Sequence, residues 1–69
     1  MEYVDETAAK IMVAAQPGDS IRRIAQKIDG SYSWVYDWIE RLEYAGFIRR
    51  EDGVYIENYA VRDRYYDLV

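Results

Sequence analysis

The chain has 69 residues, a formal net charge of −4, and neither cysteine nor histidine. A chain of this length buries only about 60% of its unfolded surface, which leaves room for one small domain. Because the commonest general base, the thiol nucleophile and the soft metal ligands are all missing, we expect no catalytic site, no metal and no other cofactor.

A first helix is predicted from Val4 or Asp5 to just before Pro17. Acidic residues 5 and 6 suit the positive end of a helix, and apolar residues then recur on one face. That face consists of Val4, Ala8, Ile11, Met12 and Ala15.

Residues 20–45 have the spacing of a helix-turn-helix. Ser20 is placed to cap a second helix that runs to about Ile28, and the small Ala25 allows a close helix crossing. A turn at Asp29-Gly30 leads to a third helix, residues 31–45, which Ser31 caps and Gly46 ends in a left-handed conformation. The apolar face of the third helix consists of Val35, Trp38, Ile39 and Leu42. Its opposite face is the candidate reader of DNA.

Residues 47–56 are predicted to form a β-hairpin, and its register follows from two isoleucines. A two-residue Asp52-Gly53 turn would put Ile48 and Ile56 on opposite faces, whereas a three-residue loop buries them together. The longer loop, with Gly53 as the left-handed residue of a bulge, is therefore predicted. It pairs Ile48 with Ile56, Arg49 with Tyr55 and Arg50 with Val54.

A last helix is expected over residues 58–69, with Asn58 as its cap. Its apolar stripe is too large for so small a domain to bury together with the first helix, so we expect a homodimer interface there. The predicted interface residues are Val61, Tyr65, Leu68 and Val69. The competing interpretation is that the stripe folds back onto the first helix.

Residues 20–56 resemble the winged helix-turn-helix transcriptional regulators, most closely the MarR and ArsR-like groups and the short haloarchaeal and viral repressors of that type. The resemblance rests on Ile24-Ala25-Gln26-Lys27-Ile28, then Val35 and Leu42, and the run from Glu43 through Gly46 to Arg50. It implies a mainly α fold with a small hairpin, in an α+β arrangement of three helices, two strands and a fourth helix, over one domain of residues 1–69. It also implies double-stranded DNA as partner and dimeric binding. No small-molecule ligand is inferred, and no membrane is expected as a partner.

The chain departs from that family pattern in two places. Asp29-Gly30 replaces the usual Gly-apolar pair of the turn. The exposed face of the third helix offers Tyr32, Ser33, Tyr36, Asp37 and Glu40, where relatives usually place arginine, lysine, asparagine or glutamine.

Charge is unevenly distributed along the chain. Residues 20–50 hold six basic and four acidic side chains, a balance of +2, and the remainder carries −6. Seven arginines against two lysines on an acidic background resemble the proteins of salt-loving archaea. The longest apolar run, residues 11–15, is far too short to span a membrane, so we expect a cytoplasmic protein.

The predicted DNA contacts fall into two chemical groups. Guanidinium and ammonium groups are expected to hold phosphates. Hydroxyl-bearing residues at the start of the third helix are expected to face the groove or a phosphate. The two groups are Arg22, Arg23, Lys27, Arg41, Arg49 and Arg50, and Ser31, Tyr32, Ser33 and Tyr36.

Two alternatives stay open beside DNA binding. The aromatic face of Tyr32, Trp34 and Tyr36 would also suit a protein-interaction module, although Trp34 has a packing role as its simpler interpretation. The chain is alternatively the N-terminal DNA-binding domain of a longer protein.

Overall fold

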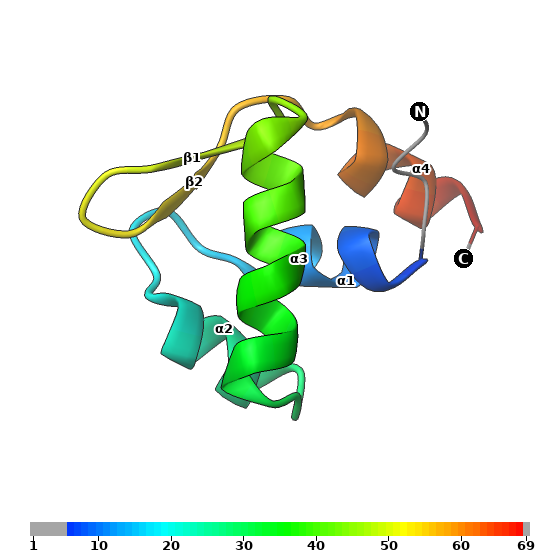
Figure 1. Ribbon diagram of the computed structural model, residues 1–69. Coiled ribbons are helices and arrows are strands. Elements are labelled where there is room, and N and C mark those ends of the chain that lie inside the picture. Colours follow the sequence, from blue (N-terminus) through cyan, green and yellow to red (C-terminus); the bar gives the residue numbers. More distant parts are fainter. Residues whose placement is uncertain (1–5, 69) are drawn as a thin grey trace.

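The computed structural model describes residues 6–68, which form four helices and one antiparallel hairpin (Figure 1). The elements are α1 (Glu6–Ala14), α2 (Ile21–Lys27), α3 (Tyr32–Tyr44), β1 (Ile48–Arg50), β2 (Val54–Ile56) and α4 (Ala60–Leu68). The predicted element order and the mainly helical α+β class are confirmed. The arrangement is compatible with a winged helix-turn-helix.

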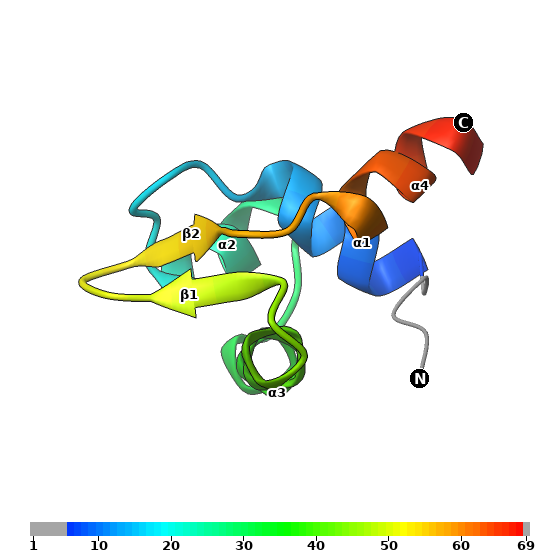
Figure 2. The same ribbon diagram turned by 90° about the horizontal axis from the view of Figure 1, so that it is seen from above.

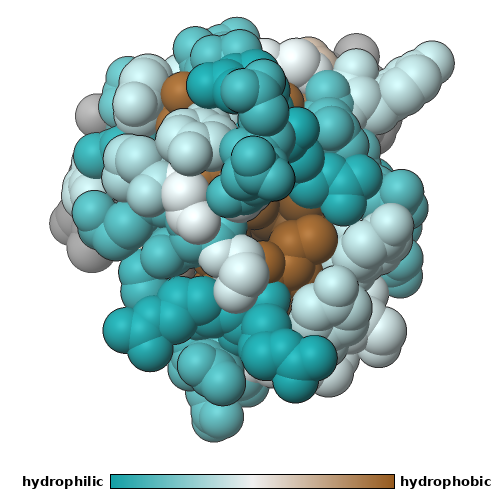
Figure 3. Space-filling model, turned by 90° about the vertical axis from the view of Figure 1, so that its left-hand side faces the viewer, coloured by the Kyte–Doolittle hydropathy of each residue, from teal (hydrophilic) through white to brown (hydrophobic). Residues whose placement is uncertain are grey.

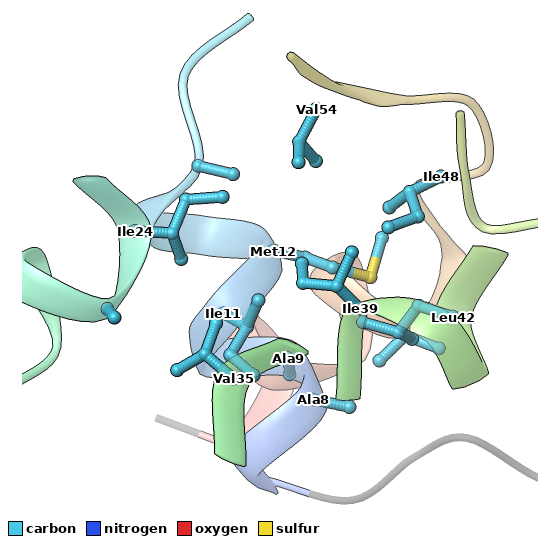
Figure 4. Packing of buried hydrophobic residues seen from close by; sticks show 13 residues of the cluster. Ala8, Ala9, Ile11, Met12, Ile24, Val35, Ile39, Leu42, Ile48 and Val54 are labelled. Carbon is cyan, nitrogen blue, oxygen red and sulfur yellow. The ribbon is translucent and has the colours of Figure 1, made fainter. Parts of the chain in front are cut away.

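One apolar core joins all of these elements. Val35, Ile39 and Leu42 of α3 are fully buried, as their spacing predicted, and Trp38 is partly buried against the same cluster. Figure 4 shows side chains of α1, α2, α3 and the hairpin converging on one centre. The buried set is Ala8, Ala9, Ile11, Met12, Ala15, Ile24, Ala25, Val35, Ile39, Leu42, Ile48, Val54 and Val61. The core therefore fixes how α2, α3 and the hairpin sit relative to one another.

Serine hydroxyls cap the N-termini of the two helices of the helix-turn-helix, as predicted. The Ser20 hydroxyl accepts a hydrogen bond from the Arg23 amide at 3.0 Å. The Ser31 hydroxyl accepts one from the Trp34 amide at 3.3 Å. Each cap satisfies an amide that has no partner within its own helix.

Both of these helices end on a left-handed residue. After α3 this is Gly46, at φ +88°, and the following amide returns to the carbonyl of Leu42. After α2 it is Asp29, at φ +57°, and the Gly30 amide returns to the carbonyl of Ala25. The turn at Asp29-Gly30 is thus built with the same motif, but the aspartate and not the glycine takes the left-handed conformation.

The hairpin has the predicted register. Ile48 pairs with Ile56, Arg49 with Tyr55 and Arg50 with Val54. Gly53 has a positive φ of +136°, and Asp52 beside it has a φ of +57°, so the loop has two residues of positive φ where one was expected.

A short backbone segment between α1 and α2 lies along the outer edge of β2, a feature that was not predicted. The Val54 amide donates to the Asp19 carbonyl at 2.8 Å, and the Gly18 amide donates to the Val54 carbonyl at 3.0 Å. The hairpin is thereby joined to the chain that enters α2.

The last helix begins later than predicted. It starts at Ala60, and the side-chain oxygen of Asn58 accepts a hydrogen bond from the Ala60 amide at 3.0 Å, so Asn58 lies outside the helix. α4 packs against α1, at the opposite end of the molecule from the hairpin loop (Figures 1 and 2).

The packing of α4 corrects part of the predicted dimer interface. Val61 is 2% exposed and belongs to the core of its own chain, and Tyr65 packs against that core. The stripe therefore folds back onto the molecule at these two positions, which was the competing interpretation. The side chain of Leu68, all of Val69 and the predicted start of the first helix lie outside the described residues, and the dimer stays a prediction.

Candidate nucleic-acid interface

One side of α3 faces outward. Viewed along its axis, α3 lies at the margin of the molecule, with the hairpin beside it (Figure 2). Tyr32 is 49% exposed, and Ser33 and Asp37 are exposed as well, while the residues of the opposite face are buried. The first half of α3 is therefore accessible to a groove of DNA or to another partner.

Four of the predicted contact residues form a continuous chain of rings and guanidinium groups across three elements. The Cζ atom of Arg22 lies 5.7 Å from the Tyr32 ring centroid. The Tyr32 and Tyr36 centroids are 6.1 Å apart, and the Arg50 Cζ lies 5.3 Å from the Tyr36 centroid. Tyr36 is thus half-buried beneath Arg50, whereas the sequence had placed it on the freely exposed face.

A hollow of about 360 Å³ opens beside this chain, between the hairpin and the starts of α2 and α3. We call it the front groove. Figure 3 views this side of the molecule and shows an apolar patch recessed among hydrophilic residues. Its lining is Gly18, Ser20, Ile21, Arg22, Tyr32, Arg50, Asp52, Gly53 and Val54. The charged residues of this lining are two arginines and one aspartate.

Arg50 already has carboxylate partners on α3. Its guanidinium donates to the Glu43 side chain at 2.8 and 3.0 Å, and a Glu40 oxygen lies 3.9 Å away. The hydrogen bond to Glu43 raises the pKa of Arg50, so this side chain stays charged. The side chains of Arg50 and Glu43 are 29% and 37% exposed, so a phosphate that enters from solvent can reach this ion pair and take the place of the carboxylate.

Arg49 points to the other face of the hairpin, because successive strand residues alternate. Its guanidinium lies over the Tyr55 ring at 4.7 Å and pairs with Glu51 and Glu57, each at 3.3 Å. The two neighbouring arginines, predicted together as a phosphate clamp, therefore belong to different surfaces.

The other predicted cations are dispersed. Lys27 pairs with Asp19 and donates to the Ala14 carbonyl at 3.1 Å, so it ties α2 to the end of α1. The Arg41 guanidinium lies 5.0 Å from the Trp38 ring centroid, and Arg23 is exposed on α2. The structure thus gathers Arg22, Tyr32 and Arg50 around the front groove, together with Tyr36 behind them, and leaves Lys27, Arg41 and Arg49 outside its lining.

The two glycines of the front groove, Gly18 and Gly53, were not predicted as part of the site. A Cβ atom built on Gly53 would lie 2.4 Å from the Gly18 carbonyl oxygen, so the two backbones touch. The sequence shows a glycine in each of the two loops. It does not show that the loops meet, because they are far apart in the chain.

Trp34 combines the two roles that the sequence left open. Its ring covers Gly30, where an added Cβ would lie 2.9 Å from ring atoms, and yet the side chain is 43% exposed. It packs on the turn and offers aromatic surface to solvent at the same time.

Among residues 6–68, no helix is long and apolar enough to cross a membrane. Within the same residues, no group of three or more Asp, Glu, His or Cys side chains is placed to hold a metal ion.

Comparisons with known proteins identify a family. No curated protein and no solved structure matches the chain. A family model described as a homeodomain-like domain matches residues 5–51, which is more than half of the chain and includes the whole helix-turn-helix. Such a domain supports DNA binding. The chain belongs to the homeodomain-like helix-turn-helix family.

Proposed function

We propose that this protein is a transcriptional regulator that lays α3 in the major groove of double-stranded DNA. The observation that carries the proposal is the front groove, where the exposed start of α3 meets Arg22 of α2 and Arg50 of β1. A helix that enters the major groove with cationic groups on its flanks is the usual geometry of helix-turn-helix proteins.

The finer parts of the proposal rest on the resemblance and on the hairpin. The winged form of a MarR or ArsR-like regulator is supported by the confirmed hairpin register directly after α3. In that form the hairpin contacts the DNA backbone beside the groove. We further propose that the protein is a single domain over residues 1–69 and forms a homodimer. Its proposed location is the cytoplasm, and its proposed source is a salt-loving archaeon.

The experiment is a fluorescence anisotropy titration of the protein with its own upstream DNA over a series of salt concentrations. Binding through phosphates releases counterions, so the logarithm of affinity should fall linearly with the logarithm of salt, by about 0.9 per phosphate contacted. Arg22→Ala should weaken binding to all sequences alike and lower that slope by about one. Arg64→Ala is the matched control, because Arg64 is an exposed arginine on α4 and does not line the front groove.

A second candidate function is supported by the aromatic start of α3. Tyr32 and Trp34 are 49% and 43% exposed, and the arginines of the hairpin already have carboxylate partners. Such a surface suits docking on a protein. Salt separates the two functions, because aromatic docking should persist or strengthen as salt rises. Absence of any salt-sensitive DNA binding would contradict the first proposal.

A further inference from the structure

A second hollow, of about 340 Å³, lies on the opposite face of the hairpin from the front groove. We call it the rear pocket. Its lining comes from the end of α1, the hairpin and the start of α4, and consists of Val13, Ala15, Gln16, Pro17, Arg49, Tyr55, Ile56, Tyr59 and Arg62. The lining contains two arginines and no carboxylate. The front groove, by contrast, includes Asp52, and a third hollow between α1 and α2 includes Asp29.

Arg62 carries the inference. Its Cζ atom lies 5.0 Å from the Tyr59 ring centroid and 5.8 Å from that of Tyr66. Aromatic rings stabilise a guanidinium through its flat faces and leave the N–H groups at its edge free to donate. The Nε atom is buried and has no hydrogen-bond partner, and no carboxylate of the described residues pairs with this side chain. A buried charged donor without an acceptor is costly, and the place of Arg62 in the pocket lining offers the rest of its guanidinium to an acceptor that enters the pocket.

Arg49 brings a second positive charge to the same pocket from the hairpin. Its partners Glu51 and Glu57 have side chains that are 75% and 51% exposed, and neither lines the pocket. The carboxylates that pair with Arg49 therefore lie outside the lining, and both charged residues within the lining are cations. Around the two cations, Pro17, Tyr55 and Tyr59 supply flat or apolar surface.

We propose that the rear pocket binds a small molecule through a carboxylate or phosphate group, which Arg62 and Arg49 hold while the tyrosines cover its body. Charge-assisted hydrogen bonds from guanidinium to such groups are among the strongest that a protein makes. This ligand site is separate from the proposed DNA-binding surface, because successive residues of β1 point to the two different hollows.

The test is a titration of the protein with sodium benzoate and, separately, with inorganic phosphate, followed by amide chemical shifts. Sodium chloride at matched ionic strength is the reference. We expect saturable shifts centred on Gln16, Tyr55 and Tyr59 with at least one of the two anions. Saturation with benzoate alone would identify a carboxylate ligand with a flat apolar body, and saturation with both would show that the oxyanion suffices.

Arg62→Gln should weaken the apparent affinity by about tenfold or more, since it removes a charged donor. Arg64→Gln, two residues further along the same helix and exposed, should leave it unchanged. If Arg62→Gln does not fold, the titration of the unmodified protein still tests the proposal. Absence of saturable shifts in the pocket with both anions overturns it.

Unchanged affinity in a folded Arg62→Gln variant overturns the proposal too. The DNA backbone is the other source of phosphate. If neither small anion binds, and Arg62→Gln weakens DNA binding while Arg64→Gln does not, then Arg62 contacts the DNA backbone. The proposal fails in that case.

Discussion

The two strands of the hairpin are attached to the rest of the molecule by different kinds of interaction. The outer edge of β2 is held by backbone, since Val54 pairs with Asp19 and Gly53 touches Gly18. β1 buries Ile48 in the core that it shares with α3, and its Arg50 side chain adds an ion pair with Glu43. Close-packed backbone permits one arrangement, whereas a partly exposed ion pair can exchange one partner for another. The hairpin is thus positioned rigidly on one side and has a replaceable contact on the side that faces α3.

The rigid side should show the largest response to substitution. Gly53→Ala places a Cβ atom 2.4 Å from the Gly18 carbonyl oxygen at a φ of +136°, so the backbones must separate. Overpacking costs about 1 to 3 kcal/mol and a positive φ adds about 1 to 2 kcal/mol, so we expect a loss of about 3 kcal/mol in the free energy of unfolding. Urea unfolding measures it.

Gly46→Ala is the control for Gly53→Ala. It has a φ of +88°, but nothing lies within 4 Å of an added Cβ, so the conformational strain alone should appear. Equal losses in the two variants would show that the contact with Gly18 contributes nothing.

The replaceable side should respond in DNA affinity more than in stability. Glu43→Gln removes the nearest carboxylate from Arg50 and frees that cation for a phosphate. We expect affinity for DNA to rise by about fivefold and the free energy of unfolding to fall by less than about 1 kcal/mol. Anisotropy at low salt measures the first quantity. Glu40→Gln should raise the affinity for DNA less, because the Glu40 carboxylate lies 3.9 Å from the Arg50 guanidinium. A larger gain from Glu40→Gln would show that Glu43 is not the carboxylate that competes with DNA for Arg50.

Tyr36→Ala tests how firmly Arg50 is held against α3. The ring lies beneath the guanidinium, and a contact of this kind contributes about 0.5 to 1 kcal/mol. We expect a loss of stability near that value, seen as a lower midpoint in urea. Tyr44, which is on the same helix and 94% exposed, supplies the matched control in Tyr44→Ala. If the two variants are equally stable, the ring does not anchor Arg50.

The smallest expected effect concerns the segment that pairs with β2. The hydrogen bond from Lys27 holds the pKa of Asp19 below its usual value of 3.8, so the folded state binds that proton less readily than the unfolded state does. The stabilisation is therefore present at neutral pH and is lost as pH falls below 3.8. Asp19→Asn should be less stable than the unmodified chain at pH 7, and the difference should close in acid. Asp63→Asn, which makes the same exchange at an exposed position of α4, is the matched control.

Features that depend on neighbours in the chain could be predicted from the sequence. Ser20 and Ser31 cap their helices, Gly46 ends α3, and Ile48 pairs with Ile56 because the two isoleucines need a common face. The capping preference and the two-residue strand period decide these features locally.

Features that depend on distant segments could not be predicted. No local pattern indicates that Gly18 meets Gly53, that Glu43 takes Arg50, or that Val61 enters the core. For the candidate site, residue types were predicted and their grouping was not. Arg49 and Arg50 were expected to act together, but strand alternation directs them to opposite faces.

The two Asp-Gly pairs have a consequence for engineering. Asp29 and Asp52 both adopt a φ of +57°, a conformation that asparagine accepts as readily as aspartate. Exchanging both for asparagine would move the formal net charge from −4 to −2 without asking the backbone to change. The net charge of this small protein can therefore be changed at its turns while the packing of its core stays the same.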